Sequence, residues 1–386
     1  MTKPNMWIRA LAFSFPFLIL IFFLGNILKS SEIYLGDKIE KCNIVDGHIR
    51  IICYKNFLEG ELKNANDSIN HLIEKWLPYV KYNTLTQANL LYQSSHGPNC
   101  HTFMHALGDV IGNRYLDNPS EGLAICANDV CSGCRMSAIT RMAYSYNYDE
   151  SKIDQLINIC LNQTYEFLCM HGAGHIFFDK YIFNITELYD MLEEGSYQST
   201  LNNSFWAIRN MSLAFEACDK FTRERLVCYL GIAHNIYHYL HFAGHEWDKG
   251  IEWCNQVEKY KEICLKSFVF ILGGSEAGPQ LIKGNTNGSI SFCTNLVQLL
   301  GEDIGKGCFK GIGLEIMGVA SSLNVDKPSK LRREFEYLAS LCKETGKYSD
   351  DCYNEMKDYI KRDINNLWIK EFKIYLSENL GKKYGF

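Results

Sequence analysis

The sequence predicts an all-α protein: a solenoid of disulfide-stapled helix-hairpin repeats behind an N-terminal transmembrane helix. Three observations support this fold class. Apolar residues recur at helical rather than alternating spacing, and only 7 of the 386 residues are proline. Fourteen of the 16 cysteines fall into near-neighbour pairs along the chain. One long apolar run stands close to the N-terminus.

The N-terminal run has the character of a membrane anchor. Lys3 and Arg9 precede an uncharged apolar stretch from Ala10 to Leu28, about long enough to cross a bilayer. Basic residues on this side favour an N-terminus left in the cytoplasm, with the bulk of the chain extracellular or lumenal. A cleaved signal peptide, which would make the protein secreted, is the alternative. The length of the run and the lack of a clear small-x-small site near its end favour a retained anchor.

The cysteine spacing predicts hairpins. Each pair encloses a short polar stretch such as "CNQVEKYKEIC", preceded by an amphipathic segment and followed by a more apolar one. An even number of cysteines, all beyond the apolar run, suits disulfides in an oxidising compartment. The predicted disulfides are Cys42–Cys53, Cys126–Cys134, Cys160–Cys169, Cys218–Cys228, Cys254–Cys264, Cys293–Cys308, Cys342–Cys352 and, between the two cysteines left over, Cys100–Cys131.

Six sequons agree with an extracytoplasmic location and predict a glycoprotein. Chance is the alternative explanation, because a chain this rich in Asn and Ser produces such triplets without modification. The candidate acceptors are Asn66, Asn162, Asn184, Asn202, Asn210 and Asn287.

The hairpin pattern resembles, in architecture, the tetratricopeptide and Sel1-like superfamily of helical repeats over roughly residues 90–365. Successive second cysteines from Cys134 to Cys352 are 35, 59, 36, 44 and 44 residues apart, with one insertion around residues 182–210. The resemblance implies a right-handed stack of helix pairs with a concave face, and it implies no chemistry by itself.

The predicted organisation has four parts. Residues 1–30 form the anchor or signal segment, 31–90 a helical N-terminal cap, 91–365 the repeat domain, and 366–386 a C-terminal helix and tail. The segment after Cys352 reads as one long terminal helix.

Eight of the 11 histidines form i,i+4 pairs, which share one helix face and suit a transition metal. His175 and His234 each follow the second cysteine of adjacent repeats by six residues, so packed helices should bring them face to face. The predicted metal ligands are His171, His175, His234 and His238, with His101, His105, His241, His245, Glu276 and Glu315 as further candidates. His105 stands in a different register, five residues after Cys100.

Imidazoles with a carboxylate suit zinc, copper or non-haem iron, because oxidised cysteines offer no thiolate. Asp109 is a third carboxylate in these segments, more simply explained as a surface charge or helix cap. Buried structural histidines and a pH-sensitive interface are the alternatives to a metal site. "CSGC" at residues 131–134 has redox-centre spacing, but Cys126 needs a partner, so we interpret both cysteines as structural.

Two functions follow from these features. The first is a membrane-anchored extracytoplasmic metalloprotein, or metalloenzyme, with a histidine-cluster site. The second is a non-catalytic glycosylated scaffold whose concave face binds a partner protein or peptide. A net charge of −5 without blocks of like charge argues against a nucleic-acid surface.

Overall fold

The computed structural model describes residues 39, 41–42, 47–65, 68–80, 100–126, 133–162, 166–182, 204–221, 224–242, 247–321, 328–362 and 367–386. Within these ranges the protein consists of helices joined by turns, without a β-strand, which confirms the predicted all-α class. No described helix is both long enough and apolar enough to cross a bilayer. The predicted anchor at residues 10–28 lies outside the described ranges and stays a prediction.

The helices form hairpins in which a first helix ends near one cysteine and a second helix begins near the next. The first helices are α6 (Pro119–Ile125), α8 (Glu150–Leu161), α11 (Ser204–Cys218), α13 (Trp247–Gln256), α16 (Thr286–Leu300) and α19 (Pro328–Glu344). The second helices are α7 (Cys134–Ser145), α9 (Glu166–Ile182), α12 (Arg225–Phe242), α14 (Lys261–Leu272), α18 (Gly307–Ser321) and α20 (Ser349–Arg362). The short helix α17 (Glu302–Gly305) lies within the connection from α16 to α18.

Among the described residues, six disulfides close these hairpins and a seventh, Cys42–Cys53, lies in the N-terminal part, all in the pairing that the cysteine spacing predicts. Their Cα atoms lie 5.3–5.7 Å apart, and each bridge spans 8–15 residues of sequence. Closing a loop of this length stabilises the folded state by about 2–3 kcal/mol on the chain-entropy model. Such a set of disulfides is typical of proteins in an oxidising, extracytoplasmic compartment. The predicted Cys100–Cys131 bridge lies outside the described residues.

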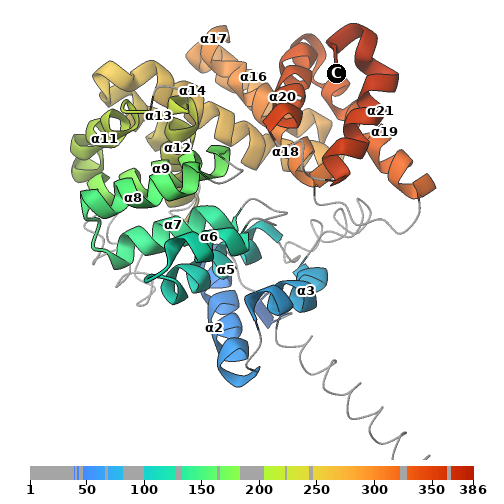
Figure 1. Ribbon diagram of the computed structural model, residues 1–386. Coiled ribbons are helices and arrows are strands. Elements are labelled where there is room, and N and C mark those ends of the chain that lie inside the picture. Colours follow the sequence, from blue (N-terminus) through green and yellow to red (C-terminus); the bar gives the residue numbers. More distant parts are fainter. Residues whose placement is uncertain are drawn as a thin grey trace, which may run out of the picture.

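The second helices pack side by side in chain order and form a continuous inner layer (Figure 1). The order is α5 (Cys100–Arg114), α7, α9, α12, α14, α18 and α20, with the first helices outside it. The inner helices contribute most of the buried apolar core. This stacking of hairpins is compatible with a helical-repeat fold.

Four contacts of the inner layer share one crossing geometry. A glycine of one helix lies against the carbonyl oxygen of the second cysteine in the next helix, so closely that a Cβ would overlap that oxygen. We call these residues the crossing glycines. Because glycine has no Cβ, the two backbones touch directly and their relative position is fixed. The pairs are Gly108 with Cys134, Gly174 with Cys228, Gly273 with Cys308, and Gly313 with Cys352.

The two ends of the layer are helical as well. At the N-terminal end, α2 (Gly47–Ala65) packs against α5, and α3 (Ile69–Val80) places Trp76 edge-on against Phe57, with ring centroids 4.8 Å apart. At the C-terminal end the expectation of one long helix after Cys352 is wrong. The chain forms α20 and then α21 (Leu367–Tyr384), which packs back on α18, α19 and α20. The apolar Phe372 and Leu376 explain this return, because they are buried within the core.

Candidate metal centre

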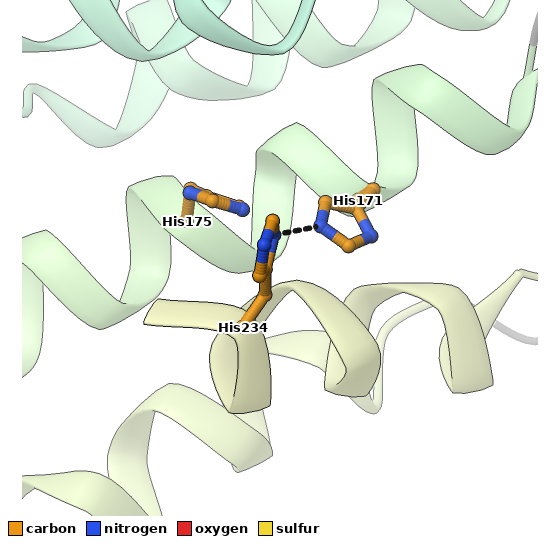
Figure 2. Close-up of side chains that lie close together, drawn as sticks. All are labelled: His171, His175 and His234. Atoms are coloured by element: carbon orange, nitrogen blue, oxygen red, sulfur yellow. Dashed lines mark hydrogen bonds between the residues drawn. The ribbon is translucent and has the colours of Figure 1, made fainter. Parts of the chain in front are cut away.

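Three imidazoles converge where α9 packs on α12. His171 and His175 come from one face of α9, one turn apart, and His234 comes from the facing side of α12 (Figure 2). One potential ligand atom from each ring can be chosen so that all three lie within 4.8 Å of one another. The expectation that His175 and His234 face one another is therefore confirmed, with their ring centroids 5.3 Å apart.

Two of the ring nitrogens are almost as far apart as two nitrogen ligands of one bound ion. His171 Nε2 and His234 Nδ1 are 3.0 Å apart and share a hydrogen bond. Two nitrogens on a tetrahedral zinc ion at 2.0–2.1 Å would be about 3.3 Å apart. The hydrogen bond means that one of these two nitrogens carries a proton. An ion needs a lone pair from each, so that ring must move its proton to its far nitrogen when a metal binds.

Glycines explain why the rings come so close. The crossing glycine Gly174 stands between the two histidines of α9, and Gly231 of α12 lies against the carbonyl oxygen of His171. Neither position has room for a Cβ. Because the two helix backbones touch here, side chains as short as imidazole can meet across the contact. The motif "CMHGAGH" therefore supplies two of the three ligands and the glycine that lets the two helices approach closely.

The three imidazoles lie in largely apolar surroundings. His171 and His175 are each only 8% exposed, and His234 is half-buried. Their helix neighbours Met170, Ile176 and Ile232 belong to the apolar core. A protonated imidazolium is costly in such surroundings, whereas a neutral ring retains a lone pair for an ion.

The other predicted ligands are not part of this three-histidine group, although His238 adjoins it. His238 is nearest, one turn after His234, with the two ring centroids 4.3 Å apart. His105 bonds instead to Ser137, with Nδ1 and Oγ 2.5 Å apart. The side chains of His101, His241 and His245 lie outside the described residues.

The carboxylate candidates are also placed elsewhere. Glu276 lies in a π-helical segment, η5 (Gly273–Ala277), and its Oε1 accepts a hydrogen bond from the Tyr237 hydroxyl at 2.9 Å. Glu315 of α18 lies against Gly278, at the start of α15 (Gly278–Ile282). Neither belongs to the three-histidine group in the described part of the chain. Among the described residues, the group thus consists of three nitrogen ligands without an acidic side chain.

Two residues that sequence reasoning missed stand beside the cluster. Asn235 follows His234 directly, and Asp179 lies one turn beyond His175 on α9. Asn235 Nδ2 donates to Asp179 Oδ1 at 3.1 Å and to the backbone oxygen of His175 at 3.4 Å. The available signal was the i,i+4,i+8 row of His171, His175 and Asp179, which continues the histidine stripe.

The carboxyl groups of Asp179 and Asp109 interact with each other. Burial raises the pKa of Asp179 from 3.8 to about 8, and the charge of Asp109 adds to the shift. Burial also raises the pKa of Asp109 to about 6, although the charges of Lys55 and Arg141 act in the opposite direction. Asp109 is therefore half-buried against the inner layer rather than an exposed surface charge.

These shifts predict that stability falls as pH rises. A carboxyl whose pKa is higher in the folded state holds its proton there after the unfolded chain has lost it. The resulting stabilisation is fully present below about pH 4 and is lost as pH rises to about 8 for Asp179. The slope is at most about 1.4 kcal/mol per pH unit for each group.

Urea unfolding of the disulfide-intact protein between pH 5 and 8, with chelator present, measures this dependence. The Asp179→Asn variant, which stays neutral, is expected to show a flatter profile than the wild type. An identical slope in both proteins would contradict the assignment to Asp179.

Comparisons of the chain with protein-family models, with curated proteins and with solved structures each found no match. The function is therefore argued from the geometry of this site.

Proposed function

We propose that this protein binds a transition-metal ion through His171, His175 and His234. One observation carries the proposal: three imidazoles from two stacked hairpins converge, with a ligand atom of each within 4.8 Å of the others. Nothing in the packing of an apolar core requires three polar rings at one helix contact, because each ring removes hydrogen-bonding groups from water.

The donor set narrows the choice of metal. Every cysteine whose side chain is described is in a disulfide, so none of these offers a thiolate ligand. Three imidazoles suit zinc, copper or iron. The nearest further ring, His238, would complete a closed four-nitrogen site if it turned inward. Without His238, the fourth position would be open to a water molecule, whose pKa a bound metal would lower enough to suit hydrolysis or hydration.

The wider proposal places this site in a membrane-anchored, extracytoplasmic protein. The disulfides support an oxidising compartment, and the apolar run from Ala10 to Leu28 supports a single-pass anchor. The sequons at the exposed Asn162 and Asn287 support glycosylation. The hairpin stack supports a tetratricopeptide- or Sel1-like architecture, whose concave face is also the place for a protein or peptide partner.

Metal analysis of the purified full-length protein tests the proposal. We expect an equimolar transition metal after dialysis, its removal by a strong chelator, and stoichiometric rebinding of zinc, copper or iron. At a free metal concentration of about 100 times Kd, binding should stabilise the fold by about 2.7 kcal/mol. If no transition metal co-purifies and none rebinds, the metal proposal is wrong, and the non-catalytic scaffold becomes the better explanation of the same fold.

A further inference from the structure

Asn235 connects the two helices that carry the histidines. Its side chain projects from α12 and donates to two acceptors on α9, the Asp179 carboxyl oxygen Oδ1 at 3.1 Å and the His175 carbonyl at 3.4 Å. Asn235 is the chain neighbour of one candidate ligand, and it bonds the backbone of another. A single amide therefore ties the positions of His175 and His234 together.

An equivalent link occurs at another crossing, where the described side chains form no histidine cluster. Counted from the crossing glycine, Asp179 is five residues after Gly174, and Asn113 is five residues after Gly108. Counted from the second cysteine, Asn235 and Arg141 are both seven residues on. Arg141 Nε donates to Asn113 Oδ1 at 2.6 Å, as Asn235 donates to Asp179. The two links are structural counterparts in different layers of the stack.

The links differ in what they hold. At the crossing of α5 and α7, the residues at the positions of His175 and His234 are Asp109 and Thr140. The Arg141–Asn113 bond therefore joins two helices without aligning a set of imidazoles. At the crossing of α9 and α12, the link also reaches the carbonyl of His175, which the counterpart does not match among the described bonds.

We propose that Asn235 and Asp179 are positioning residues of the metal site, which hold the three imidazoles in a ligand-ready arrangement before an ion binds. This inference rests on the proposed metal function. Asn235 fixes α12 against α9 at the level of the ligands, and Asp179 fixes the Asn235 amide by accepting its hydrogen. Residues that orient metal ligands in this way typically change metal affinity by 10–100-fold when they are removed.

The test compares metal affinity and ligand geometry in matched variants of the full chain. Asn235→Ala and Asp179→Ala are expected to weaken zinc binding by about 10–100-fold. With cobalt(II) as a spectroscopic probe, their visible absorption bands should shift or broaden, because the ligand rings are less well fixed. Asn113→Ala removes the counterpart bond in the other layer. It should cost similar thermal stability and leave both the zinc Kd and the cobalt spectrum at wild-type values.

Asp179→Asn separates positioning from a general packing effect. The amide oxygen of the new side chain is still an acceptor for Asn235, so we expect a Kd within a few-fold of wild type. Wild-type affinity and spectrum in Asn235→Ala would overturn the inference and leave the metal site standing. An equal loss of affinity in Asn113→Ala would also overturn it, because the effect would then be one of stability alone. If the wild-type chain binds neither zinc nor cobalt, the proposed function itself fails.

Discussion

Replacing His175 and His234 together with alanine is expected to abolish metal binding. The double change removes two of three converging ligands and leaves one imidazole, which does not hold an ion against water. Structural zinc sites gain roughly 10–16 kcal/mol from about four ligands, so two ligands contribute about 5 kcal/mol or more. We therefore expect Kd to rise by more than about 1,000-fold. Competition with a chromophoric chelator measures the change.

The matched control is His71→Ala. His71 is exposed on α3, outside the histidine cluster, so its loss should leave Kd and stoichiometry unchanged. Mass spectrometry of unreduced peptides should recover the same disulfides from both variants, which excludes misfolding as the cause. Retention of equimolar metal by the double variant would show that the ion binds at another cluster.

Gly231→Ala is expected to have the largest effect on the fold at this site. A Cβ at Gly231 would overlap the backbone oxygen of His171, and a backbone atom of a packed helix has little freedom to move away. Inserting a methyl group into a close contact typically costs about 1–3 kcal/mol, and more where backbone must shift. Because α12 must move away from α9, the 3.0 Å contact between His171 and His234 should also be lost. We expect a lower Tm together with weaker metal binding.

Gly60→Ala is the control for this substitution. Gly60 lies within α2, and a Cβ there would meet nothing within 4 Å. Alanine is the better helix former, so this change should stabilise the protein by about 0.5–1 kcal/mol. A loss of stability in Gly231→Ala together with a gain in Gly60→Ala would show that the loss comes from the contact between α9 and α12. Equal tolerance at Gly231 would show that α9 and α12 do not touch as described.

The hairpins could be predicted from the sequence because two cysteines that lie close together in the chain indicate a turn between two helices. The meeting of His175 with His234 could be predicted for a related reason. Both residues are six positions after the cysteine that begins the second helix, and in this pair of hairpins the cysteine spacing matches the true register. Counting from the second cysteine was enough here, because both helices reach their contact at the same number of residues after that cysteine.

The register of the other layers could not be predicted in this way. The crossing glycines Gly174 and Gly313 are five residues after their cysteines, but Gly108 is eight after Cys100 and Gly273 is nine after Cys264. Helices α5 and α14 therefore enter their next contact about one turn later. Counted from the cysteine, His105 matches no histidine of the other repeats. Counted from the crossing glycine, His105 is three residues before Gly108, as His171 is three residues before Gly174. Which residues cross depends on three-dimensional packing, and no local spacing encodes it.

Asn235 and Asp179 escaped sequence analysis for a similar reason. An asparagine and an aspartate on two helices carry no motif, and their 3.1 Å bond joins residues 56 positions apart. The carboxylate candidates show the reverse case, since the sequence proposed them and the three-histidine group does not include them. Glu276 and Glu315 stand in short glycine-rich stretches, and the structure gives these glycines to helix contacts and a π-helical segment.

X-ray absorption at the metal edge of the zinc-loaded protein tests the central claim most directly. The account predicts a first shell of nitrogen at about 2.0–2.1 Å, with the outer-shell scattering of three imidazole rings. A first shell containing sulfur, or one made of oxygen without imidazole scattering, would contradict the assignment of His171, His175 and His234 as the ligands.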